Sequence, residues 1–315
     1  MFGVLSCVAT DHDLWLVTVA AIICILGCWS TTKLVMQAQA LEGAERLGWA
    51  FLGSITAGAS IWCTHFVAML AYQSGVPVSF DPVLTILSLV VAIVGACVSL
   101  MIATCRLSRF APVIGGGLLG LSIAAMHFTG MRAYRVHGIL EWDPAYVIAA
   151  LVLVVPLAAA SLETLLRRSF QRHVVVSASL LMLAIVTLHF TAMTAVTVTP
   201  LGPAANQSDP KAIQAMALAV ALACSIILGA GLVSYMIDIR SRRTHYRRLR
   251  QMALFDQLTS LPNRASFTDQ LAHDLAVADR LGSQVAVVGI DLDRFKVIND
   301  VRGHRIGDEV LRRLG

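Results

Sequence analysis

The chain has 315 residues, of which 57% are hydrophobic and only 14% are charged. Soluble domains average roughly 45–50% apolar and about 25% charged residues, so this composition excludes an ordinary soluble protein. The formal net charge of +5 comes mostly from basic residues between apolar segments and does not indicate a nucleic acid polymer as a partner.

Charge is distributed unevenly along the chain. Residues 1–237 carry 19 of the 43 Asp, Glu, Lys and Arg residues, whereas residues 238–315 carry 24. The second part therefore has the charge density of a soluble domain. We expect a membrane domain over 1–237, a basic juxtamembrane signalling helix over 238–255 and the N-terminal part of a soluble α/β domain over 256–315.

The first part contains seven stretches without Asp, Glu, Lys or Arg. About 20 mostly apolar residues cross a bilayer as a helix, and every stretch reaches or nearly reaches that length. We therefore predict an all-α membrane bundle of seven transmembrane helices embedded in a lipid bilayer. The stretches are 14–32, 47–80, 82–105, 110–131, 144–162, 173–208 and 212–237.

The Lys and Arg residues between these stretches predict the orientation. Cytoplasmic loops carry an excess of both residues. Here 13 of them lie on the side that includes Arg250, against three on the other side, namely Arg132, Arg135 and Lys211. We expect the N-terminus outside and the C-terminus in the cytoplasm, in agreement with an odd number of spans.

The second, fourth and sixth spans carry a repeated motif, which reads CTHFVAM, AMHFTGM and TLHFTAM. Its histidines are His65, His127 and His189, and successive copies are 62 residues apart. The repeating unit is a pair of helices that occurs three times, and the seventh helix stands outside it.

Each motif histidine is followed four residues later by a methionine, namely Met69, Met131 or Met193. Residues four apart share a helix face, so three His–Met columns should reach the outer half of the bilayer. His12 precedes the first span on the same side, and Met126 occurs in one copy only. Imidazole and thioether suit copper, above all Cu(I), and an open position on the metal would bind a diatomic gas. The simpler alternative is that the histidines bond between helices and the methionines pack.

The seven spans, the three repeats and the sequence Met126-His127-Phe128-Thr129 resemble the MHYT family of bacterial membrane sensors, over roughly residues 8–237. The resemblance implies a copper site near the outer face and sensing of oxygen, carbon monoxide or nitric oxide. Phe replaces Tyr in all three copies, and Thr64 and Leu188 replace the first Met in two, while the histidine is present each time.

Residues 238–255 are expected to form a helix that leaves the membrane, with apolar residues interspersed among arginines. Two interpretations remain open. The helix is either a polybasic anchor on anionic lipid or a signalling helix that pairs across a homodimer.

The soluble part begins with a predicted helix from about 265 to 281. The Val-rich run 284–290 then predicts a buried strand that ends at Asp291, and another helix starts near Arg294. Ligands sit at the carboxyl ends of strands in open α/β sheets. Asp291 is therefore a candidate ligand of a Mg²⁺ ion that holds substrate phosphates.

Residues 254–315 resemble the N-terminal part of the GGDEF domain of diguanylate cyclases, which make cyclic di-GMP from two GTP. The resemblance implies Mg²⁺ binding by Asp291 and the Leu292 carbonyl, phosphate binding by the backbone of Arg294 and Phe295, and guanine binding by Asn299 and Asp308. The family's Gly-Gly-Asp/Glu-Glu-Phe hairpin would lie beyond Gly315. Residues 1–315 alone are therefore expected to be inactive, and whether an EAL phosphodiesterase domain follows stays open.

The leading hypothesis is a sensor in the bacterial cytoplasmic (inner) membrane. It would detect a diatomic gas or redox state through copper and control cyclic di-GMP synthesis from GTP, as a homodimer. Two alternatives come from other classes of protein. One is a receptor with a non-catalytic cyclase remnant that binds partners or nucleotide, and the other is a copper transporter or membrane redox protein.

Overall fold

A computed structural model describes residues 11–73, 76, 78–105, 108–167, 171–200 and 210–314 of the chain. The chain divides into two compact units, Met1–Tyr235 and Met236–Gly315. The backbone passes from the first unit to the second within one helix, α8 (Pro210–Leu254). The expected helix over 238–255 is thus the last part of α8.

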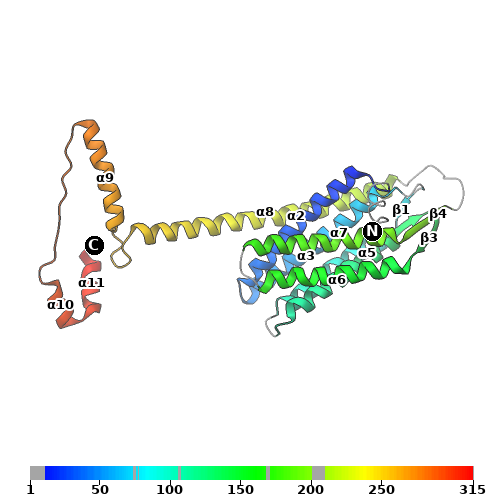
Figure 1. The fold of residues 1–315 in the computed structure, drawn as a ribbon, viewed down its shortest axis with the longest axis horizontal. Helices are drawn as coiled ribbons and strands as arrows, with labels where there is room; N and C mark the ends of the chain where they lie inside the picture. Colours follow the sequence, from blue (N-terminus) through cyan, green and yellow to red (C-terminus); the bar gives the residue numbers. More distant parts are fainter. Residues whose placement is uncertain are drawn as a thin grey trace. The chain divides into compact units, whose positions relative to one another are not determined.

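Long helices make up the first unit (Figure 1). Within the described residues, seven helices are long and apolar enough to cross a membrane, which confirms the predicted spans. Many of their large apolar side chains are exposed, as expected of a surface that lipid covers. The chain is a multi-pass membrane protein. Besides α8, its spanning helices are α2 (Leu14–Gln39), α3 (Gly43–Ala71), α4 (Pro82–Ala103), α5 (Ala111–Ala133), α6 (Pro144–Arg167) and α7 (Gln171–Thr194).

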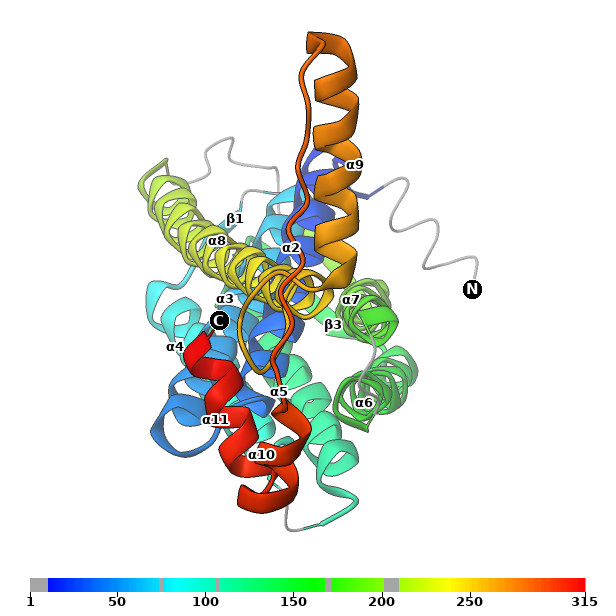
Figure 2. The ribbon, with the colours of Figure 1, turned by 90° about the vertical axis from the view of Figure 1, so that its left-hand side faces the viewer.

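The first six of these helices form a ring of three hairpins, which Figure 2 views roughly along the helices. Helix α2 packs on α3, α4 on α5 and α6 on α7, and the ring closes where α7 contacts α2. Helix α5 also contacts both α3 and α7. Small residues allow close approach between membrane helices. Gly116 on α5, for example, lies against the backbone of Ala158 and Ala159 on α6, where a Cβ would not fit.

Each hairpin is closed in the same way at one end. An aspartate caps the first helix by accepting hydrogen bonds from backbone N–H groups of its first turn. The N–H of that aspartate donates to the carbonyl of an alanine at the end of the second helix. The three pairs are Asp13–Ala71, Asp81–Ala133 and Asp143–Ala195, with N···O distances of 2.8, 2.8 and 2.9 Å.

Short antiparallel pairings extend these closures. Strand β1 (Val78–Phe80) pairs with β2 (Tyr134–Val136), and β3 (Gly138–Trp142) pairs with β4 (Val196–Pro200). In the first hairpin a single bridge between His12 and Tyr72 takes their place. The pseudo-threefold repeat thus includes the connections at this end of the bundle as well as the helices.

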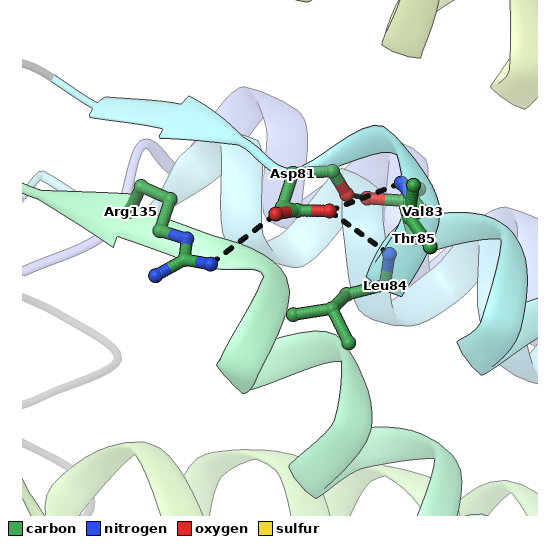
Figure 3. A network of polar contacts seen from close by, with 5 residues as sticks. All are labelled: Asp81, Val83, Leu84, Thr85 and Arg135. Carbon is green, nitrogen blue, oxygen red and sulfur yellow. Dashed lines mark hydrogen bonds and ion pairs between the residues drawn. The ribbon is translucent and has the colours of Figure 1, made fainter.

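The closure of the second hairpin includes an ion pair (Figure 3). Asp81 accepts from the N–H groups of Val83 and Leu84, and its other oxygen lies 3.2 Å from the Arg135 guanidinium on β2. The N–H of Leu84 and then Arg135 hold the pKa of Asp81 below its usual value. Arg135, which the sequence marks only as a charge on the outer side, thereby fastens β2 to the start of α4.

The second unit contains a turn and three helices after α8. Asp256 accepts from the backbone and hydroxyl of Thr259, which lowers its pKa. Asn263 then caps α9 (Arg264–Leu281) by accepting from the N–H of Ser266. Helices α10 (Phe295–Arg302) and α11 (His304–Leu314) pack on each other.

The strand predicted over 284–290 is not formed. This segment is extended but pairs with no other strand among the described residues, and Val288 and Ile290 are 82% and 88% exposed. A strand is stabilised by a hydrogen-bonded neighbour and by side chains that pack on its faces. The prediction rested on periodicity and composition. Neither of these shows whether a segment has a neighbouring strand to pair with or side chains to pack against.

Candidate metal centre

Three histidines from three helices meet inside the first unit. His65 lies on α3, His127 on α5 and His189 on α7. The Nδ1 atom of His65 is 3.1 Å from Nδ1 of His127 and 3.3 Å from Nδ1 of His189. Among the described residues, only these three form a group of His, Cys, Asp or Glu side chains close enough to hold a metal ion. The structure thus brings together the histidines that the repeat singles out, and metal binding stays a prediction.

The geometry of the cluster fits one metal ion. Imidazole nitrogens bound at about 2.0–2.1 Å with tetrahedral angles lie roughly 3.3–3.4 Å apart, close to the two Nδ1 distances. Nδ1 of His65 has either one proton or one lone pair to share between its two neighbours, so hydrogen bonds alone satisfy the three Nδ1 atoms incompletely. All three Nε2 atoms are buried and have no hydrogen-bond partner among the described residues.

The cluster borders a cavity of about 160 Å³. Helices α2, α3, α5 and α7 contribute its walls, which are apolar except for the histidines, Thr64 and Cys24. Cavities with apolar walls take up small apolar molecules. An ion held by the three histidines would therefore lie beside a space whose walls are largely apolar.

The predicted methionines differ in their placement. Met69, Met131 and Met193 are buried but do not line the cavity, whereas Met126 does. The +4 spacing places each methionine one turn beyond its histidine, at the hairpin ends. Met126 immediately precedes His127 and shares its wall of the cavity. The methionine that occurs in only one copy of the motif is thus the one of these four that lines the cavity.

His12 lies near the cluster but outside it. Its ring centroid is 6.3 Å from that of His189 and 5.3 Å from that of Phe190. The same position of the other two hairpins, directly before the capping aspartate, is occupied by Phe80 and Trp142. These rings likewise pack on the phenylalanine that follows a motif histidine, with Phe66–Phe80 and Phe128–Trp142 centroid distances of 5.7 and 5.8 Å. His12 therefore occupies the aromatic position of a repeated packing pattern.

Gly130 is a site residue that sequence reasoning missed. A Cβ added there would lie 2.5 Å from Nε2 of His65, too close for any real contact. The other two copies of the motif have alanine at this position, namely Ala68 and Ala192. The signal was present in the sequence as the one glycine three residues after a motif histidine. Its reason, the neighbouring imidazole, is visible only in three dimensions.

In the second unit, the predicted phosphate and magnesium residues lie on one turn. Asp291 is exposed directly after the extended segment. The Leu292 carbonyl accepts a hydrogen bond from the N–H of Phe295, with an N···O distance of 3.4 Å. Arg294 has a left-handed backbone (φ 56°) and reverses the chain into α10. The sequence interval Asp291–Phe295 thus forms a compact turn with one free carboxylate at its start.

The predicted guanine residues lie on the α10–α11 pair. The Asn299 side chain and the Phe295 ring both pack against Gly307, which is buried and leaves no room for a Cβ. Asp308 follows Gly307 directly. The structure therefore brings Asn299 and Asp308 to the same junction, while their binding of guanine stays a prediction.

Comparisons with protein families give two matches. Residues 58–116 and 120–178 match the MHYT family, described as a bacterial signalling protein N-terminal repeat. Residues 253–315 match the GGDEF domain of diguanylate cyclases. No solved structure matches the chain.

Several known proteins are similar to this chain over most of its length. An uncharacterized signaling protein of Caulobacter vibrioides is 35% identical, over 80% of this chain and 31% of its own length. Two proteins of Pseudomonas aeruginosa are each 32% identical. One is the bifunctional diguanylate cyclase/cyclic di-GMP phosphodiesterase MucR, matched over 96% of this chain and 46% of its own length. The other is the cyclic di-GMP phosphodiesterase NbdA, matched over 87% and 39%. The chain thus spans less than half the length of these relatives.

Proposed function

Because this chain belongs to the bacterial signalling proteins that join MHYT repeats to the start of a GGDEF domain, we propose that it senses a signal through a copper ion held by His65, His127 and His189. The sensor would control cyclic di-GMP synthesis from GTP. The observation that carries the proposal is that Nδ1 of the buried His65 lies 3.1 Å from Nδ1 of His127 and 3.3 Å from Nδ1 of His189.

Copper fits this donor set better than the other common metals. Three neutral imidazoles are borderline donors, and copper lies at the top of the affinity order for such ligands. The cluster has no carboxylate, which argues against magnesium and calcium. Copper there would supply an open coordination position, and the adjacent apolar cavity would admit oxygen, carbon monoxide or nitric oxide. The chain's own contribution is to fix the three rings and to exclude water.

The GTP-binding part follows the same reasoning. The exposed carboxylate of Asp291 and the Leu292 carbonyl are oxygen ligands of the kind that Mg²⁺ uses with nucleotides. Asn299 and Asp308 offer an amide and a carboxylate for the guanine edge. Two such sites would meet in a homodimer and join two GTP molecules, so α8 would report the state of the sensor by changing how the two copies pair.

We also propose that the histidine cluster faces the outside of the cytoplasmic membrane. The excess of Lys and Arg on the other side supports this orientation. Reporter fusions after Arg109 and Arg250 are expected to report cytoplasm, and fusions near Gly138 and Asn206 the periplasm. A periplasmic fusion after Arg250 would overturn the orientation.

The sensing proposal predicts a copper-dependent output. The test uses cells that express this chain extended by the rest of its GGDEF domain, with cyclic di-GMP measured in copper-replete and copper-chelated medium. Couplings between sites typically change output by about fivefold or more, so we expect a change of that order in the wild type and none in His65→Ala. Met69→Leu, at a buried residue outside the cavity, should respond as the wild type. An unchanged copper response in His65→Ala would refute copper sensing by the cluster.

A further inference from the structure

A pair of thiols lies beside the histidine cavity. Cys24 and Cys28 are one turn apart on α2, both fully buried, with a Sγ···Sγ distance of 4.0 Å. Cys24 and Met126 line the same cavity as the three histidines. We propose that Cys24, Cys28 and Met126 form a second, sulfur-based site that binds a soft univalent metal ion such as Cu(I).

The distance between the thiols suits a metal and not only a packing contact. Two metal–sulfur bonds of about 2.3 Å span 4.0 Å at an angle of about 120°. That angle belongs to a three-coordinate site, and Met126, which lines the same cavity as Cys24, is the residue proposed as its third donor. Thiolate and thioether sulfur select Cu(I) over the hard cations.

A univalent ion also avoids the free-energy cost of burying a net charge in the membrane. Binding forms one metal–thiolate bond and releases one thiol proton to water, while the second thiol and the thioether bind as neutral donors. The +1 charge of the ion and the −1 charge of the thiolate cancel. No net charge is then buried in the membrane, where an uncompensated charge is costly.

The packing of α2 on α3 places this site next to the histidines. Gly27 lies directly against Ser60, where a Cβ would not fit. Counting from this contact toward the end of the bundle that carries the strands, Cys24 is three residues away along α2. His65 is five residues away in the same direction along α3. At 1.5 Å per residue, Cys24 lies only about 3 Å along the axis from the level of His65, and Cys28 lies about one turn further. Along the helix axes, the sulfur site would therefore lie directly next to the histidine cluster.

A matched pair elsewhere shows that spacing alone does not define the site. Cys97 and Met101 on α4 are also four residues apart, with a Cys97 Sγ to Met101 Sδ distance of 3.9 Å. Met101 is 52% exposed, however, and neither residue lines the histidine cavity. The pair Cys24–Cys28 differs by its full burial and because Cys24 shares a cavity with Met126.

The test measures binding of silver(I), a soft univalent probe without redox chemistry, to the purified full chain in detergent. Silver per chain is measured by mass spectrometry, and its ligands by X-ray absorption at the silver edge. We expect sulfur neighbours in the wild type and in Cys97→Ser. In the background Cys63→Ser/Cys224→Ser, which removes a thiol pair with a Sγ···Sγ distance of 3.5 Å, the further change Cys24→Ser/Cys28→Ser should remove these sulfur neighbours and weaken silver binding at least tenfold.

Two results would overturn the proposal. One is a wild-type spectrum with no sulfur neighbours, which does not depend on how any variant folds. The other is equal silver binding in the Cys63→Ser/Cys224→Ser background with and without Cys24→Ser/Cys28→Ser. That result would mean that Cys24 and Cys28 only pack against each other and bind no metal. His127→Ala separates this site from the histidine cluster. Sulfur neighbours must persist in that variant whether or not the histidines bind metal.

Discussion

Replacing Asp291 by alanine, in a longer protein in which this chain continues into the rest of its GGDEF domain, is expected to lower cyclic di-GMP synthesis at least about a hundredfold. Mg²⁺ is held by only one or two carboxylates together with substrate phosphates, so each carboxylate is indispensable. Loss of even an outer partner of a metal ligand costs about 10–100-fold. The measurement is the rate of cyclic di-GMP formation from GTP at saturating Mg²⁺.

Asp293→Ala is the matched control for this prediction. Asp293 is exposed on the same turn as Asp291 and has no assigned role, so its loss changes the local charge by the same amount. We expect this variant to keep most of its activity. If Asp291→Ala kept as much activity as Asp293→Ala, the proposal that Asp291 is a metal ligand would be wrong.

The second large effect is expected at the histidine cluster. His127→Ala should lower the copper content of the purified chain at least about tenfold, because two imidazoles leave a three-ligand site incomplete. Gly130→Ala should act in the same direction, since the added Cβ would lie 2.5 Å from Nε2 of His65 and would displace that ring. Copper per chain is measured by mass spectrometry after size-exclusion chromatography.

Two controls separate ligand loss from general damage. Ala192→Gly changes the position that matches Gly130 in the third copy, and Met69→Leu keeps the volume of a buried side chain outside the cavity. Both should retain copper. The helical content of His127→Ala should be unchanged, because backbone hydrogen bonds of a membrane helix are satisfied within the helix. If Gly130→Ala retains copper with its helices intact, the assigned position of the His65 ring is wrong.

The membrane architecture was predictable from the sequence because it rests on local features. Uncharged stretches long enough to span a bilayer identify each helix separately. The 62-residue period then shows that His65, His127 and His189 hold equivalent places. What the period could not show is how three equivalent helices face one another, and the Nδ1 contacts depend on that.

The finer features of the site depend on packing that the sequence does not display. The +4 rule correctly places Met69 on the face of His65 but also carries it one turn further along α3, away from the cavity. Met126 lines the cavity because of its neighbour His127. The role of Gly130 depends on the imidazole of another repeat.

The second unit shows the same limit in another form. Helix α9 (Arg264–Leu281) agrees closely with the helix predicted from about 265 to 281, and in the structure Asn263 and Gly282 cap its two ends. The run 284–290 has the composition of a buried strand, yet it is extended and exposed. A strand needs a paired neighbour, and composition alone cannot supply one.

Copper K-edge X-ray absorption of the wild-type chain, purified from copper-replete membranes, tests most directly whether the three histidines form a metal site. We expect bound copper with about three nitrogen neighbours at roughly 2.0 Å, the usual imidazole–metal distance. In His127→Ala we expect this nitrogen shell to be absent. A wild-type protein without copper, or with copper that shows no nitrogen neighbours, would contradict the proposal that the histidine cluster is the sensor's metal centre.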